Sequence, residues 1–111
     1  MPLKDLLMER FSVKTRAVEN PLNVTSLGAT AQKLLSNNPN RLGFVIVNLS
    51  ANIVYIGLEN SVSSTKGIRL DANGGSSGCI WDEDFDMTAW AWWAVASGAA
   101  SAIYVLEIVE Y

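Results

Sequence analysis

The sequence predicts an all-β fold: a jelly-roll-like antiparallel β-sandwich of roughly six to eight strands, preceded by a short N-terminal helix and an extended arm. Three observations lead to this class. Short runs rich in Val, Ile, Tyr and Trp recur at intervals of roughly 8–12 residues, as in sandwiches. Clusters of Gly, Asn, Ser and Pro separate these runs. With 111 residues, of which 50% are hydrophobic and 17% charged, the chain can enclose one core.

The first 28 residues are predicted to lie outside the sandwich. Four apolar residues recur at helical spacing within residues 2–11, with charged residues between them: Leu3, Leu6, Leu7 and Phe11. A helix of about ten residues is marginal alone, so it must pack against something. Residues 12–28 are mixed and polar, which predicts an extended arm. We therefore expect residues 1–28 to form the helix and arm, and residues 29–111 to form the sandwich.

Several segments of the sandwich part are predicted strands, each bounded by turn residues. They are residues 29–35, 41–49, 53–58, 67–71, 78–81, 87–96 and 102–110. The short turn Ser50-Ala51-Asn52 predicts that the second and third of these segments pair as a hairpin. The residues around Ser97-Gly98 are predicted to join the last two strands in the same way.

Several of these strands are apolar on both faces. Successive side chains of a strand point to opposite sides. Val45 and Val47 alternate with Phe44 and Ile46, so neither face of this segment is polar. An antiparallel sandwich commonly buries one face of each strand and wets the other. The pattern therefore predicts a second covering surface, most simply another copy of the chain, and hence an assembly protein.

Enzyme chemistry is not expected. The chain has no histidine, which excludes Ser-His-Asp and Cys-His nucleophiles and most zinc sites. Residues 74–78 match the G-x-S-x-G pattern, but no strand-to-helix turn and no histidine accompany them. The single cysteine, Cys79, is expected to be a small buried hydrophobic residue. We therefore predict no catalytic residues, no cofactor and no resident metal.

The charge distribution bears on partners. Residues 1–41 contain six basic and three acidic side chains, whereas residues 42–111 contain two basic and eight acidic ones. An acidic body disfavours nucleic-acid binding, and the basic leader either docks on the body of a neighbouring subunit or is simply solvated. No apolar run reaches the roughly 18 residues of a membrane span, so no membrane partner is expected. The charged, leucine-containing N-terminus does not suit a signal peptide, which favours synthesis in the cytoplasm.

Two further groups of side chains are candidate contacts. Asp82, Asp84 and Asp86 would share one strand face, where they could meet a cation or a basic partner, or simply form a solvated edge. The tryptophans form the second group. Trp90 and Trp92 would lie on one strand face and Trp93 on the other, as core and interface anchors or, alternatively, as a stacking platform for a glycan.

One stretch resembles a known family. The segment of residues 41–57, Arg-Leu-Gly-Phe-Val-Ile-Val-Asn-Leu-Ser-Ala-Asn-Ile-Val-Tyr-Ile-Gly, is similar to a hairpin of small β-sandwich structural proteins of tailed bacteriophages and related viruses. Further pieces extend the resemblance over about residues 40–110: Gly67-Ile68-Arg69-Leu70, Asn73-Gly74-Gly75, the run from Ala94 to Gly98, and Val105-Leu106-Glu107. The tryptophan-rich strand and the basic helical leader depart from the family pattern.

The resemblance implies a non-enzymatic virion protein, made in the host cytoplasm, that serves as a capsid decoration, spike or fibre-base component. It also implies a homo-oligomer, favouring a trimer, that contacts other virion proteins such as the major capsid protein. The residues expected to form the oligomer interface are apolar or aromatic: Leu3, Leu6, Leu7, Phe11, Trp90, Trp92, Trp93 and Tyr104. The alternative function is a carbohydrate- or receptor-binding module that uses exposed tryptophans.

Overall fold

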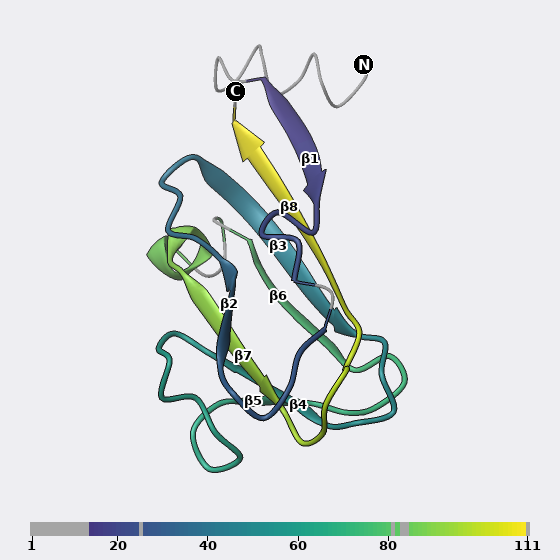
Figure 1. The fold of residues 1–111 in the computed structure, drawn as a ribbon. Coiled ribbons are helices and arrows are strands. Elements are labelled where there is room, and N and C mark those ends of the chain that lie inside the picture. The colour runs from purple at the N-terminus through teal and green to yellow at the C-terminus, as the bar shows by residue number, and fades with distance from the viewer. Residues whose placement is uncertain (1–13, 25, 81, 83–84, 111) are drawn as a thin grey trace.

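The computed structural model describes residues 14–24, 26–80, 82 and 85–110. It contains two antiparallel four-stranded sheets packed face to face (Figure 1). We call the first sheet I; its strands, in spatial order, are β1 (Thr15–Glu19), β8 (Ile103–Glu110), β3 (Arg41–Asn48) and β6 (Ser76–Ile80). Sheet II consists, in the same way, of β2 (Gln32–Leu35), β7 (Trp92–Ala96), β4 (Val54–Gly57) and β5 (Ile68–Leu70). The all-β, two-sheet class predicted from the sequence is confirmed.

The chain passes from one sheet to the other at most of its turns. Along the sequence, β4 and β5 are the one pair of consecutive named strands that are hydrogen-bonded to each other. The predicted hairpin of residues 41–49 with 53–58 is wrong, because β3 pairs with β8 and β6 while β4 pairs with β7 and β5. The second predicted hairpin is wrong for the same reason, since β7 and β8 lie in different sheets.

The segment expected to be an arm contributes a strand. Thr15–Glu19 form β1, which pairs along its length with β8, from Thr15 opposite Glu110 to Glu19 opposite Leu106. Sheet I therefore includes residues that precede the boundary expected at residue 28. The helix expected at residues 2–11 lies outside the described residues. Farther along, the expected strand over residues 87–96 begins instead as a 3₁₀ helix, η1 (Phe85–Ala89), before β7 starts at Trp92.

The core lies between the two sheets and is almost entirely apolar. Leu35, Ile46, Val54 and Leu70 are among its fully buried members. The ring of Phe44, on sheet I, meets the ring of Trp92, on sheet II, edge to face, with 5.2 Å between their centroids. Cys79 is buried among these side chains, as predicted. The core thus uses one face of each sheet and leaves the other faces outward.

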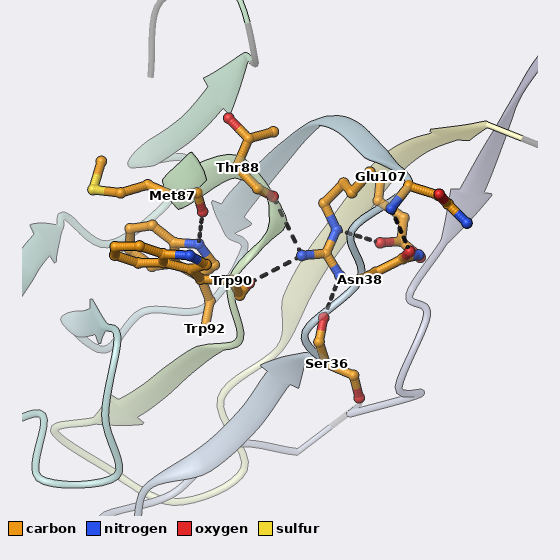
Figure 2. A network of polar contacts seen from close by, with 9 residues as sticks. Ser36, Asn38, Met87, Thr88, Trp90, Trp92 and Glu107 are labelled. Carbon is orange, nitrogen blue, oxygen red and sulfur yellow. Dashed lines mark hydrogen bonds and ion pairs between the residues drawn. The ribbon is translucent and has the colours of Figure 1, made fainter. Parts of the chain in front are cut away.

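A buried arginine ties several elements together at one end of β3. Arg41 Nε donates to Glu107 Oε2 on β8 at 2.6 Å, and both side chains are more than nine-tenths buried. The other guanidinium nitrogens donate to the backbone oxygens of Thr88, Trp90 and Ser36. Figure 2 shows these groups gathered around the guanidinium. One side chain therefore connects β3 and β8 of sheet I to the segment after β2 and to the segment before β7.

A buried asparagine also ties several chain segments together, at the other end of β3. The side-chain amide of Asn48 donates to the carbonyl oxygens of Asn52, Leu70 and Asp71, and its Oδ1 accepts from Ser50. These contacts fix the turn that carries the chain from sheet I to sheet II and hold the end of β5 beside it. Because buried polar groups are costly unless paired, this side chain specifies the turn strongly.

Removing the buried arginine should destabilise the fold far more than removing an exposed one. Arg41→Met leaves Glu107 buried without its partner, which should lower the free energy of unfolding by about 3–5 kcal/mol. Arg69→Met is the matched control, since Arg69 pairs with Asp71 at 2.8 Å but both side chains are mostly exposed. Its substitution should lower the free energy of unfolding far less, because solvent screens an exposed ion pair. Urea denaturation measures both, and equal losses would contradict the role given to Arg41.

Candidate functional site

The outward face of sheet I is apolar where a solvated sandwich would be polar. The side chains of β8 alternate, so Tyr104, Leu106 and Ile108 point away from the core. The register places Val45 beside Leu106 and Val47 beside Tyr104. At one end of the face two isoleucines project: Ile80 is 54% exposed and Ile108 is 42% exposed. We call the outward-pointing residues of β3, β6 and β8 the outer face.

The outer face also contains a hollow. Gly43 lies opposite Ile80 on one side and Ile108 on the other, so a residue without a side chain separates the two isoleucines. A hollow of about 150 Å³ opens here and is lined mainly by Gly43, Val45, Ile80, Leu106 and Ile108. A Cβ at Gly43 would extend toward the carbonyl oxygen of Cys79, to 3.3 Å. The face therefore combines projecting aliphatic side chains with a recess of side-chain size.

Tyr104 marks the polar rim of the outer face. Its hydroxyl donates to Glu19 Oε2 at 2.8 Å, which links the neighbouring strands β8 and β1 through their side chains. This hydrogen bond, together with desolvation and the nearby negative charge, raises the pKa of Tyr104. A tyrosine and a carboxylate beside an apolar centre match the usual organisation of protein interfaces, which have a polar rim.

The tryptophans lie differently from the sequence expectation. Trp92 points into the core, is 3% exposed, and donates its Nε1 to the carbonyl oxygen of Met87. Trp92 is therefore a core residue and does not form the exposed strand face with Trp90 that the sequence predicts for an interface or a glycan platform. Trp93 is half-buried on the outward side of sheet II, with the Lys33 ammonium 5.4 Å from its ring centroid. Trp90 precedes β7 and is 44% exposed.

The acidic residues do not form the strand face that was expected. Asp86 lies in η1 and is exposed, and Asp82 is exposed as well. Asp84 lies outside the described residues. The expectation of three carboxylates along one strand is wrong for Asp86, because a 3₁₀ turn replaces the strand there. Among the residues that the structure describes, no group of three or more Cys, Asp or Glu side chains could hold a metal ion.

The outer face includes one predicted interface residue and several that were not singled out. Tyr104 belongs to it, whereas Leu3, Leu6, Leu7 and Phe11 lie outside the described residues. Ile80, Leu106 and Ile108 were missed as candidates. The apolar residues on both faces of the strands were the sequence signal for them, but the aromatic residues are the stronger candidates by residue type. The pattern shows that a second face is apolar; it does not tell which of the two faces is the core.

Known proteins give no match from which a family could be assigned to this chain. No protein-family model, no curated protein and no solved structure matches the chain. Within the described part of the chain, no helix is both long enough and apolar enough to cross a membrane.

The hydrogen bond between Tyr104 and Glu19 should be visible in a pH titration. Glu19→Gln removes the carboxylate, so the pKa of Tyr104 should fall toward the ordinary tyrosine value of about 10. Because folding raises this pKa, the contact stabilises the fold below about pH 10 and loses that effect as the phenol ionises at higher pH. Phenolate absorbance, with the Tyr104→Phe titration subtracted, measures the shift.

Glu110→Gln is the matched control for this titration. Glu110 also lies on β8 and pairs with Thr15 of β1, but it makes no hydrogen bond to Tyr104. Its substitution should leave the Tyr104 titration almost unchanged. A Tyr104 pKa that is equal in the wild type and in Glu19→Gln would contradict the contact.

Proposed function

We propose that this chain is a non-enzymatic structural protein that self-associates through the outer face of sheet I. One observation supports this most directly: the same face carries both projecting isoleucines, Ile80 and Ile108, and the hollow between them. A second copy presents the same knobs and the same hollow, so the surface is complementary to itself, as a symmetric contact requires. Burial of these side chains releases about 25 cal/mol for each Å² of apolar surface removed from water.

The order of the strands supports a jelly roll as the finer description of the sandwich. Sheet I runs β1-β8-β3-β6 and sheet II runs β2-β7-β4-β5, so most successive strands alternate between the sheets. Jelly rolls are frequent in viral capsid proteins and also in lectins. Since a fold alone does not determine a function, the strand order agrees with an assembly role and adds weight to it only by analogy.

We further propose that the assembly belongs to a virus particle, as a capsid decoration, spike or fibre-base component that contacts other virion proteins. The support is the sequence resemblance of residues 41–57 together with the strand order. The genes beside its own test this proposal. Capsid, portal or tail genes there would support it, whereas a neighbourhood of metabolic genes would contradict it.

Placing a charge on the outer face should separate the subunits. Ile80→Asp and Ile108→Asp should each weaken self-association about tenfold or more, because a carboxylate would be buried opposite an apolar surface. Light scattering over micromolar concentrations gives the mass of each species and distinguishes the trimer that the resemblance favours from a dimer.

Ile68→Asp is the matched control for these variants. Ile68 is 45% exposed, close to the 42% of Ile108, and lies on β5 of sheet II rather than on the outer face. The control should keep the wild-type mass, and all three variants should keep the wild-type thermal unfolding profile at low protein concentration. A wild-type protein that stays monomeric at these concentrations would overturn the proposal.

A further inference from the structure

A second apolar feature lies apart from the outer face, at the end of the sandwich where sheet II meets η1. It is a cavity of about 360 Å³. Six apolar side chains supply most of its lining: Ile56, Leu58, Val62, Ile68, Met87 and Trp92. Ile56 and Trp92 are buried, whereas Leu58 and Ile68 are 38% and 45% exposed. The cavity therefore extends from the core to an opening flanked by aliphatic side chains.

One wall of the cavity is a connection that is firmly held. The connection between β4 and β5 places Val62, which is only 6% exposed, against Gly57 and Gly67. A Cβ at Gly67 would lie 2.8 Å from Val62 Cγ2 and 2.9 Å from the carbonyl oxygen of Ile56, so glycine is needed for this close approach. Ser63 and Lys66 also exchange two backbone hydrogen bonds, of 3.0 and 3.1 Å. The wall is thus formed in the free chain.

The polar groups around the cavity already have partners. Trp92 Nε1 donates to the Met87 carbonyl oxygen, so this N–H already has its hydrogen-bond partner. At the rim, Lys66 Nζ donates to Glu59 Oε2 at 3.0 Å and to Ser61 Oγ at 2.8 Å. This contact with Lys66 lowers the pKa of Glu59. Among the described residues that line the cavity, Lys66 is the one cation, and Glu59 balances its charge.

We propose that this cavity binds a small, uncharged, apolar molecule of two to three fused or linked rings. An apolar cavity of about 150 Å³ holds benzene, so a cavity of about 360 Å³ has room for a larger aromatic or alicyclic body. Ligand sites of about 300–1,000 Å³ lined by apolar and aromatic side chains are typical of small-molecule binding. The site is separate from the proposed assembly surface, and one function can fail without the other.

The test uses a pair of fluorescent probes that share one carbon skeleton. N-phenyl-1-naphthylamine is neutral and emits strongly in apolar surroundings, and 8-anilino-1-naphthalenesulfonate is its anionic counterpart. The neutral probe should bind the wild-type protein saturably at one site per chain, at least tenfold more tightly than the anionic one. Equal binding of the two probes, or no saturable binding of the neutral probe, would overturn the proposal.

Variants then locate the binding. Leu58→Asp and Ile68→Asp each place a charge at the opening and should weaken binding of the neutral probe at least tenfold. Leu22→Asp is the matched control, because Leu22 is also 38% exposed but does not line the cavity. The control and the double variant Ile80→Asp/Ile108→Asp should bind within about twofold of the wild type.

Two opening positions are used so that one misfolded variant does not end the test. Circular dichroism and thermal unfolding confirm that each variant is folded before its binding is measured. Unchanged affinity in the folded Leu58 and Ile68 variants would place the probe elsewhere and overturn the proposal. Loss of binding in the double variant at the outer face would do the same, because it would assign the probe to the assembly surface.

Discussion

The fold depends on a charged pair placed where apolar residues would be expected. Arg41 and Glu107 sit on the core side of neighbouring strands, and the guanidinium also holds the backbone oxygens of Ser36, Thr88 and Trp90. Alone, a buried ion pair adds little net stability, because desolvation offsets the attraction. The pair contributes mainly by fixing positions, because it holds together segments that are far apart in the sequence. Asn48 satisfies three carbonyl groups at the opposite end of the same strand.

The sequence was informative about strands and uninformative about their neighbours. Alternation and turn residues located most of the strands within a few residues, because side-chain period and turn chemistry are local properties. Pairing is not local. Nothing in Arg41–Asn48 itself shows that its partners are Ile103–Glu110 and Ser76–Ile80. The first strand, Thr-Arg-Ala-Val-Glu, escaped detection because an edge strand with a mostly exposed pattern has a weak apolar signal.

The apolar pattern of the strands predicts that an apolar face lies outside the core, but it does not identify which residues form that face. The two-sided apolar pattern indicates a face that the core does not cover. The tryptophans are predicted to anchor a partner there because they bury a large area with few rotamers lost and because they alternate with alanine. Trp92 instead fills the core beside Phe44, whereas Trp90, Ile80 and Ile108 are among the large hydrophobic residues that are exposed. The motif of residues 41–57, which carries the resemblance, contributes in two ways. Its Arg41 and Asn48 hold the sheets together. Its Gly43 and Val45 line the hollow of the outer face, so the same segment contributes to both the architecture and the candidate surface.

The position of β8 has a consequence for biosynthesis. The last strand is not at an edge: it lies between β1 and β3, and Thr15 pairs with Glu110 across almost the whole length of the chain. During translation β1 therefore lacks its neighbouring strand until β8 has left the ribosome. Folds dominated by such distant pairings close slowly. The nascent chain exposes a bare strand edge for that interval, and the crowding of identical chains on one messenger would favour exchange of β1 between them.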